Sequence, residues 1–478
     1  MTWITIDRDK PIPLTRQLYT ELRGQILRGD RKAQDKLPST RKMAEDLGIS
    51  RNVVIEAYEQ LFAEGYMESR KGSGYFVSAG IYLEQHARKE TPPISSGENK
   101  AESLSIIDFR SGVPDLTHFP RQTWGKMVQR ACQEAPLSAF GYGRPEGRLE
   151  LRQVVSRYLY RTRGVQCKPE QIIVTSGATQ ALTLIAKVLL GQGKSAVIED
   201  PITQDIQTIF KATGAVLRPV STDEYGLMTE QLPSREESAP SFVFLTPSHQ
   251  FPLGGTLPIQ RRLQLIRYAR LTDCYIVEDD YDSEFRYDSA PISSLQGLAE
   301  ERVIYIGSFS KILSPGLRLG YLVLPPDLVE RYRDAKWYSD LHTPALDQLA
   351  LAMFIEEGHL EKYISRVKKL YRKRRQALCG ALEQTFLGTT DIRILGASAG
   401  LHIVAAFADI PFTPALLEKL QVAGVRVYPV EEHAICPGRH VDKIILGYGN
   451  LSEEKIVEGV KRLYSVLSVA GSLSGENL

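Results

Sequence analysis

Apolar residues recur at two different spacings along this chain of 478 residues, and each spacing predicts a different kind of element. Leu14, Leu18, Leu22 and Ile26 recur every fourth residue, and Leu27 extends their stripe, which predicts a helix over residues 14–28. From Ile107 onward, short apolar runs alternate with longer helical patterns. The runs are IIVTSG, SAVIED, SFVFLTP, CYIVEDD and RVIYIGS, and the helical patterns include ATQALTLIAKVLL and RRLQLIRYARL. This alternation predicts an α/β fold with a large doubly wound sheet.

The pattern divides the chain into three regions. Residues 79–106 contain Pro-Pro and Ser-Ser-Gly, many charges and few apolar residues, which is typical of a solvated linker. Helix dominates after about residue 325, including 343–386, and the strands LHIVAAF, VRVYPV and KIILGYG then precede a helix from Ser452. We therefore expect a small helical domain over 12–80, a flexible linker over 81–106, and a unit over 107–478 that ends in a smaller α+β domain.

Composition excludes several classes of protein. Net charge is +2, and residues 1–80 carry 13 Lys and Arg against 11 Asp and Glu, so any nucleic-acid interface depends on where charges lie. No apolar run reaches the length of a membrane span, and the first residues lack an export signal. The five cysteines form no CxxC pair, and His433 and His440 near Cys436 lack metal-ligand spacing. We expect a cytoplasmic protein with no membrane partner and no metal site.

Two helices joined by a glycine turn are predicted within LPSTRKMAEDLGISRNVVIEAYEQLFAEGY. Ser39 can cap the first helix, Gly48 begins the turn, and Ser50 can cap the second helix. The inward face of the second helix is expected to contain Val54, Ala57, Tyr58, Leu61 and Phe62. This geometry is a helix-turn-helix.

The second helix of this motif begins with residues suited to reading bases. Arg51 can donate two hydrogen bonds to guanine, and Asn52 can pair with adenine. Arg41 suits a phosphate, and MESRKGSGYFV predicts a hairpin with a basic tip at residues 71–74. The alternative is a three-helix interaction module with solvated charges. For the basic stretch RVKKLYRKRR (366–375), a solvated helix face is the preferred interpretation.

Residues 12–78 closely resemble the winged helix-turn-helix of GntR-type bacterial regulators. The LPS-R segment, the SR-V---Y--L core and the glycine-rich wing occur in that family's order. The resemblance implies that double-stranded DNA is contacted by Ser39, Arg41, Arg51, Asn52, Lys71, Gly72, Ser73 and Gly74.

A lysine ends one of the predicted buried strands. In RVIYIGSFSKILSPGLRLGY, Lys311 stands among hydroxyl residues and is followed by Arg318. Burial lowers the pKa of a lysine and prepares it to form a Schiff base. Ser308, Ser310 and Arg318 could hold a phosphate, and a carboxylate in Glu278-Asp279-Asp280 could hold a protonated pyridine nitrogen. Together these residues favour pyridoxal phosphate (PLP).

Residues 107–470 resemble fold-type I aminotransferases, which are PLP-dependent. The resemblance implies that Lys311 is the aldimine-forming lysine, Asp279 the pyridine-nitrogen partner and Tyr281 the phenol near the 3-hydroxyl. It also implies phosphate contacts from Ser308, Ser310, Arg318, Ala178 and Thr179, and from Tyr142 toward the partner subunit's cofactor. Without the resemblance, the Gly177-Ala178-Thr179 turn is a weak phosphate signal and the acidic run could be a solvated loop.

The order of the two domains resembles the MocR/GabR subfamily of transcription regulators, of which TPSHQFPLGG is also typical. The resemblance implies a head-to-tail homodimer that senses an amine-bearing, amino acid-like effector by external aldimine formation at Lys311. Two alternatives stay open. One is a working aminotransferase with an added DNA-binding domain, and the other is a regulator whose large domain only dimerises.

Three departures from the aminotransferase pattern bear on function. Phe251-Pro252-Leu253-Gly254 replaces Asn-Pro-Thr-Gly, so the bond from asparagine to the 3-hydroxyl is lost or comes from His249 or Gln250. Thr203 stands where an aromatic residue often stacks on the ring. Ile445 stands where the carboxylate-binding arginine is expected, which leaves Arg144, Arg426 and Arg439 as candidates and hints at an effector other than a simple amino acid.

Overall fold

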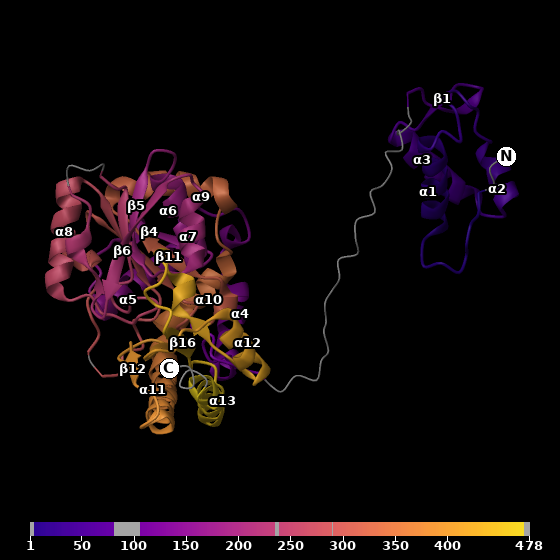
Figure 1. Ribbon diagram of the computed structural model, residues 1–478. Coiled ribbons are helices and arrows are strands. Elements are labelled where there is room, and N and C mark those ends of the chain that lie inside the picture. The colour runs from indigo at the N-terminus through magenta and orange to yellow at the C-terminus, as the bar shows by residue number, and fades with distance from the viewer. Residues whose placement is uncertain (1–3, 81–105, 235–238, 289, 473–478) are drawn as a thin grey trace. The chain divides into compact units, whose positions relative to one another are not determined.

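The computed structural model describes residues 4–80, 106–234, 239–288 and 290–472, and these form two compact units. One unit precedes residues 81–105 and the other follows them (Figure 1). The expected linker over 81–106 lies outside the described residues, except for residue 106. No helix in the described ranges is long and apolar enough to cross a bilayer.

The smaller unit is a three-helix domain with a hairpin. It contains α1 (Leu14–Leu27), α2 (Thr40–Leu47), α3 (Arg51–Ala63), β1 (Met67–Arg70) and β2 (Gly74–Val77). The Ser39 hydroxyl accepts a hydrogen bond from Lys42 N at 3.2 Å, and the Ser50 hydroxyl accepts one from Val53 N at 3.4 Å, so both predicted caps are present. Gly48 ends α2 with φ +62°, a left-handed conformation that glycine adopts without strain.

One residue expected in the core of this unit lies on its surface. Val54, Ala57, Tyr58 and Leu61 are fully buried, but Phe62 is 51% exposed. The buried positions follow the spacing i, i+3, i+4 and i+7, and position 62 lies one residue, or about 100°, beyond that stripe. The prediction that Phe62 faces inward is therefore wrong.

The larger unit contains an eight-stranded sheet covered by helices on both faces (Figure 1). The strand order is β4-β11-β10-β9-β8-β5-β6-β7, and β5, β6, β8, β9 and β10 run parallel. The strands are β4 (Ile172–Thr175), β5 (Ser195–Asp200), β6 (Val216–Asp223), β7 (Gly226–Leu227), β8 (Phe242–Leu245), β9 (Tyr275–Asp280), β10 (Val303–Ser308) and β11 (Gly320–Val323). The expected α/β architecture is confirmed.

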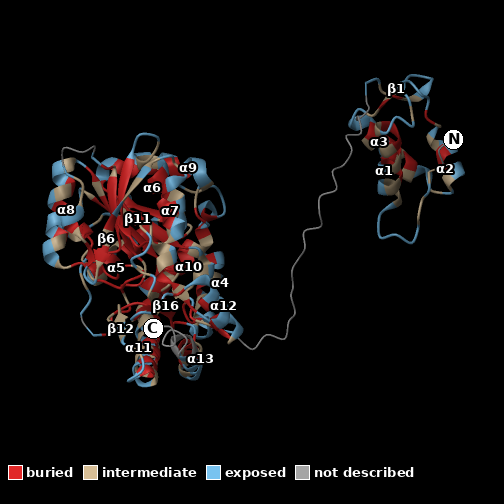
Figure 2. Cartoon of the chain, viewed as in Figure 1, coloured by how far each residue is buried: buried red, intermediate tan, exposed pale blue. Residues whose placement is uncertain are grey.

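Buried helix residues meet the sheet on each face (Figure 2). On one face α6 (Ala178–Leu189), α7 (Gln204–Lys211) and α9 (Val329–Asp340) pack around Phe210 and Tyr332. On the other face lie α5 (Leu149–Arg163), α8 (Ile259–Thr272) and α10 (Ala345–Glu356), and α4 (Arg121–Glu134) packs against α10. Because both faces are covered, β4, β5, β8 and β10 are buried along their whole length.

A smaller α+β part completes this unit. Its sheet has the order β12-β13-β16-β15, and a short parallel pair joins β3 to β14. The elements are β3 (Ile107–Asp108), α11 (His359–Phe386), β12 (Ile392–Leu395), β13 (His402–Phe407), α12 (Pro414–Val422), β14 (Val425–Arg426), β15 (Tyr428–Pro429), β16 (Lys443–Gly447) and α13 (Glu453–Ser472). The helical stretch 343–386 is two helices separated at Gly358, whose φ is +72°.

The basic stretch at 366–375 is only partly a solvated face. Arg374 is buried, and its Nη2 lies 2.6 Å from the carboxylate of Asp115. Arg375 pairs with Asp288, and Arg372 donates to the carbonyl of Tyr287 at 2.9 Å. Several of these cations therefore stabilise the fold, which corrects the sequence interpretation.

Candidate functional site

A cavity of about 460 Å³ opens at the carboxyl ends of the parallel strands of the larger unit. Ligands of open α/β sheets bind at this edge. Five of the predicted cofactor residues line the cavity, although they come from three separate parts of the chain. They are Ala178, Thr179, Asp279, Tyr281 and Lys311.

The alternation of side chains along β9 separates its three consecutive acids. Asp280 Oδ2 accepts hydrogen bonds from Arg163 Nε at 2.7 Å and from the Tyr305 hydroxyl at 2.5 Å, both buried. Glu278 Oε2 accepts the backbone N–H of Gln296 at 3.1 Å. Asp279 points to the other side of the strand, into the cavity. Since the protein engages the neighbouring carboxylates, Asp279 is the acid available to a ligand.

Asp279 is buried, and one oxygen of its carboxyl, Oδ1, has no hydrogen-bond partner in the described part of the chain. Burial, together with the nearby carboxylates Asp280 and Asp282 and against the opposing effect of Lys311, raises the pKa of this carboxyl to about 7. An unpaired buried acceptor is costly, so a cationic N–H donor in the cavity would relieve it. This property fits the protonated pyridine nitrogen of PLP.

Lys311 follows β10 and reaches into the same cavity. Its Nζ donates a hydrogen bond to the carbonyl of Gly112 at 2.5 Å. Burial lowers the pKa of the amine, the carboxylates Asp282 and Asp279 raise it, and the cation of Arg110 lowers it. A lysine with a lowered pKa has more of the neutral amine that attacks a carbonyl carbon.

A turn suited to an anion begins α6. Gly177 has φ +84°, and Ala178 and Thr179 present the first N–H groups of the twelve-residue helix to the cavity. A Cβ at Gly177 would lie 2.8 Å from Nη2 of Arg318, which donates to the carbonyl of Ser176 at 2.7 Å. The guanidinium of Arg318 is therefore fixed directly behind the turn.

Besides Arg318, three predicted phosphate residues lie outside the cavity lining of this structure. The Ser308 hydroxyl accepts a hydrogen bond from Ser310 N at 3.1 Å, and neither serine lines the cavity. Tyr142 is 84% exposed and also lies away from the lining. Their assignment to the phosphate stays a prediction, and for Tyr142 it requires a second subunit.

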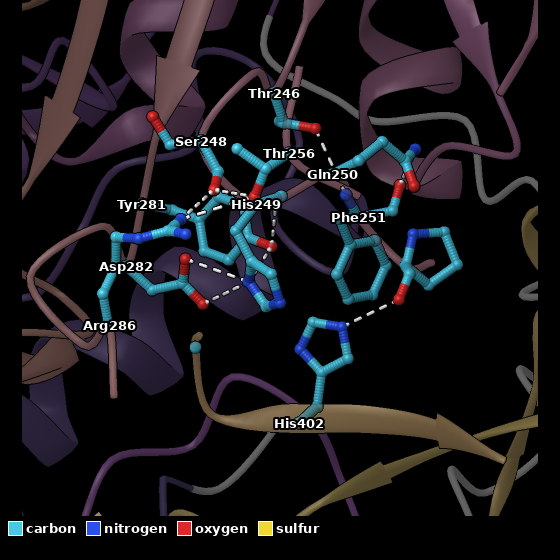
Figure 3. A network of polar contacts seen from close by, with 12 residues as sticks. Thr246, Ser248, His249, Gln250, Phe251, Thr256, Tyr281, Asp282, Arg286 and His402 are labelled. Atoms are coloured by element: carbon cyan, nitrogen blue, oxygen red, sulfur yellow. Dashed lines mark hydrogen bonds and ion pairs between the residues drawn. The ribbon is translucent and has the colours of Figure 1, made fainter. Parts of the chain in front are cut away.

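A buried polar network lies beside Tyr281 (Figure 3). The Tyr281 hydroxyl donates to the carbonyl of His249 at 2.9 Å, and His249 Nδ1 lies 3.0 Å from the nearer carboxylate oxygen of Asp282. His402 donates through Nε2 to the carbonyl of Pro252 at 2.9 Å. A ring nitrogen of His249, a carboxylate oxygen of Asp282 and a ring nitrogen of His402 lie within 4.8 Å of one another. These contacts fix the position of the Tyr281 phenol.

Neither of the two residues considered as a substitute for the missing asparagine, His249 or Gln250, lines the cavity. Gln250 is fully buried and donates to the carbonyls of Pro201 and Phe251 at 3.0 and 2.6 Å. His249 is 2% exposed. Phe251 does line the cavity, which puts an aromatic ring there that sequence reasoning did not anticipate.

The arginines suggested for a carboxylate lie elsewhere. Ile445 is buried in an apolar cluster, so β16 offers no cation at that position. Arg426 bonds Gln421 at 3.4 Å and Arg439 bonds Ser221 at 2.7 Å, while Arg144 is 3.8 Å from Glu146, and none of the three lines the cavity. The arginine that does line it is Arg110, which sequence reasoning missed because it follows a two-residue strand without a recognisable motif.

The predicted DNA contacts gather at one end of the smaller unit's helix pair and on its hairpin. Arg51 and Asn52 are the first residues of α3 and are exposed, and Arg51 Nε lies 3.4 Å from the Thr40 hydroxyl. Arg41 is exposed and pairs with Glu45 at 3.3 Å. The residues Lys71, Gly72, Ser73 and Gly74 are exposed at the hairpin tip.

Comparison with known proteins places both units in families. Residues 14–77 match the bacterial regulatory proteins of the gntR family, and residues 105–440 match aminotransferase class I and II. The probable rhizopine catabolism regulatory protein MocR of Rhizobium meliloti is 36% identical over 97% of this chain and 95% of its own length. The HTH-type pyridoxine biosynthesis transcriptional regulator PdxR of Corynebacterium glutamicum is 32% identical over 84% of this chain and 85% of its own length.

The larger unit also resembles solved enzymes. The kynurenine aminotransferase of Pyrococcus horikoshii has a TM-score of 0.71 and 29% identity, with 77% of this chain and 92% of that chain covered. The α-aminoadipate aminotransferase LysN of Thermus thermophilus, complexed with a phosphopyridoxyl-leucine, has a TM-score of 0.70 and 30% identity, with 77% and 94% covered.

Fold, site and comparisons together define a GntR-type winged helix-turn-helix joined to a class I aminotransferase domain. The chain belongs to the MocR-type HTH transcriptional regulators.

Proposed function

We propose that this regulator binds PLP at Lys311 and senses an amine-bearing effector that displaces Lys311 from the cofactor. The observation that carries the proposal is the buried, unpaired Oδ1 of Asp279 in the cavity that also holds Lys311. When bound, PLP supplies an aldehyde carbon that condenses reversibly with primary amines.

Each residue of the cavity has a separate task in this proposal. Lys311 offers its neutral amine to the cofactor and releases its place to the effector. Asp279 and Tyr281 line the cavity, where Asp279 would accept the hydrogen bond of the protonated pyridine nitrogen and Tyr281 would contact the ring's 3-hydroxyl. The phosphate would be held by Ala178, Thr179, Ser308, Ser310 and Arg318, and by Tyr142 of a second copy in a head-to-tail homodimer.

The effector acts on DNA only through its different affinity for two arrangements of the dimer. We propose that exchange of Lys311 for the effector amine changes the contacts at the carboxyl end of β10 and so shifts the balance between these arrangements. The winged helices then bind or release the operator. Turnover is not required for this response.

A working aminotransferase is the second candidate. It is favoured by the complete set of Lys311, Asp279 and Tyr281 in one cavity, and by a relative, the 2-aminoadipate transaminase of Thermus thermophilus, which is 32% identical over 75% of this chain. It is opposed by Ile445, which is buried where the enzymes are expected to carry an arginine.

One experiment tests the cofactor and the sensing together. We expect the full chain incubated with PLP to gain an absorbance band above 400 nm, and borohydride reduction to label residue 311. Addition of amines should shift the band without sustained release of a keto acid. Sustained release would support the enzyme, and a colourless protein would refute PLP binding. Lys311→Ala serves as the control that retains the cavity but loses the covalent link.

DNA recognition is tested separately. Arg51→Ala should weaken operator binding by about 1–3 kcal/mol and relax the sequence preference, as expected for a guanidinium that bonds two atoms of a base. Arg28→Ala is the matched control, because Arg28 carries the same charge but is paired with Asp30 at 2.9 Å. Equal effects of both substitutions on fluorescence-anisotropy titrations would contradict a specific role for Arg51.

A further inference from the structure

We infer that Arg110 binds the carboxylate of the amino acid-like effector, because Ile445 stands where an arginine is expected and Arg110 lines the cavity. This inference rests on the proposed function, because it takes the amine end of the effector to occupy the place of Lys311. It extends that function by assigning the residue that selects among amines.

The first observation is the charge that lines the cavity. Arg110 is the one guanidinium among the described residues that line it, and the only lysine there is Lys311, whose pKa is lowered by burial. His402 and His433 also line it, but burial lowers the pKa of both imidazoles, so that they are neutral at neutral pH. An anionic group of the effector therefore has one permanent cation to bind in the described lining.

The second observation is that Arg110 lacks a partner of its own. Within the described ranges its guanidinium makes no hydrogen bond and no ion pair. The other arginines considered for this role are engaged, since Arg426 bonds Gln421 and Arg439 bonds Ser221. A guanidinium presents a planar fork that matches a carboxylate with two parallel hydrogen bonds.

The third observation is that the backbone holds Arg110 in place. Phe109 is fully buried, its N–H donates to the carbonyl of Arg426 at 3.0 Å, and its carbonyl accepts the N–H of Gly447 at 2.8 Å. A Cβ at Gly447 would lie 2.2 Å from the carbonyl oxygen of Arg110, so this glycine allows β16 to pack directly against residue 110. The backbone at residue 110 is thus fixed, whereas the Arg110 side chain has no partner in the described residues, which suits a cation that binds a ligand.

The described acidic side chains that line the cavity do not form an ion pair with Arg110. Asp279 is reserved for the cofactor's nitrogen in the proposed function, and Asp282 is bonded to His249. Asp205 lies at the cavity on the exposed first turn of α7. The cation of Arg110 acts directly on Lys311, because it lowers the pKa of the Lys311 amine. A carboxylate on Arg110 therefore lies within electrostatic reach of the amine that the effector replaces.

The test uses matched pairs of probes that differ only in the carboxylate. The full chain loaded with PLP is titrated with glycine, β-alanine, 4-aminobutanoate and 5-aminopentanoate, and with the corresponding primary amides, which keep the amine but lack the negative charge. Cofactor absorbance gives apparent Kd values, and the midpoint of thermal unfolding gives a second measure of binding. The series of lengths finds the amine-to-carboxylate separation that the cavity accepts.

We expect the wild-type protein to prefer the best-fitting acid over its amide by roughly 10- to 100-fold, as for hydrogen bonds to a charged partner. Arg110→Gln should bring this preference close to one and leave amide binding unchanged, and Arg110→Lys should retain part of it. Arg393→Gln removes an exposed arginine paired with Glu224 and should change nothing. Because Arg110 makes no contact that supports the fold, the variants should unfold at the wild-type temperature.

Three results would overturn the assignment. A preference that survives in Arg110→Gln refutes it, and so does a loss of preference in Arg426→Gln instead. Wild-type protein that binds acids and amides equally at every length refutes it while leaving the proposed function standing. If no amine perturbs the spectrum of the loaded wild-type protein, the proposed function itself fails and the assignment falls with it.

Discussion

The buried, unpaired carboxyl of Asp279 should lower the free energy of unfolding of the cofactor-free protein as pH rises. The ordinary pKa of this group is 3.8, and burial together with the neighbouring carboxylates raises it to about 7 in the folded chain. The unfolded state therefore loses its proton first as pH rises, and the folded state is penalised increasingly between these two values. Each unit of pKa difference corresponds to ~1.36 kcal/mol, so the full penalty approaches about 4 kcal/mol above neutral pH.

Asp279→Asn removes the titration while nearly preserving the shape of the side chain. We expect the variant to gain stability over the wild type by an amount that grows with pH, by about 3 kcal/mol between roughly pH 5 and pH 8. The measurement is urea unfolding of both cofactor-free proteins at several pH values. The same substitution should weaken PLP binding, because an amide cannot accept the pyridine proton.

The adjacent acid provides the control. Asp280→Asn leaves Arg163 buried without its carboxylate, which we expect to cost about 3–5 kcal/mol. The two neighbouring substitutions should thus change stability in opposite directions. If Asp279→Asn destabilises the cofactor-free protein as much near pH 8 as near pH 5, the electrostatic reasoning is refuted.

Four other substitutions test the described packing. Leu61→Ala should cost about 2–5 kcal/mol of unfolding free energy in the smaller unit, whereas Phe62→Ala should change it by less than about 0.5 kcal/mol, and equal losses would contradict the surface position of Phe62. Arg374→Ala should cost about 3–5 kcal/mol because it breaks the buried ion pair with Asp115, which chemical denaturation can measure. Gly400→Ala should lower the thermal midpoint and weaken PLP retention, because its Cβ would lie 2.1 Å from the ring of His249. An unchanged midpoint would argue against a rigid polar network around His249.

Elements with a strong period or a strong cap could be predicted from the sequence. Ser39 and Ser50 occupy the caps expected of them, and the apolar runs of β4, β5, β8, β9 and β10 are all strands of the large sheet. β6 and β11 were not singled out. The β6 segment VLRPVSTD is half polar, and β11 follows the lysine motif that drew attention to chemistry instead.

Local sequence could not establish which side chains meet. Asp279 could be chosen among three acids by resemblance, but only the partners of Asp280 and Glu278 show why it is the free one. Arg110 was missed because its position depends on β16, which lies more than 330 residues further along the chain. Phe251 likewise reaches the cavity through a turn whose shape the sequence does not encode in a periodic pattern.

The alternation of side chains along β9 limits which mutations such chains can accept in evolution. Deleting a single codon before position 279 would turn every following side chain to the opposite face, so that Asp280 would replace its neighbour in the cavity and Arg163 would lose its anchor. A substitution in this strand can change one of these sites alone. An insertion or deletion there disrupts both the cavity at Asp279 and the ion pair between Asp280 and Arg163. Sensors with new specificities should therefore arise by exchange of residues on the cavity wall and by lengthened loops beyond the strand ends, never by slippage within the strand.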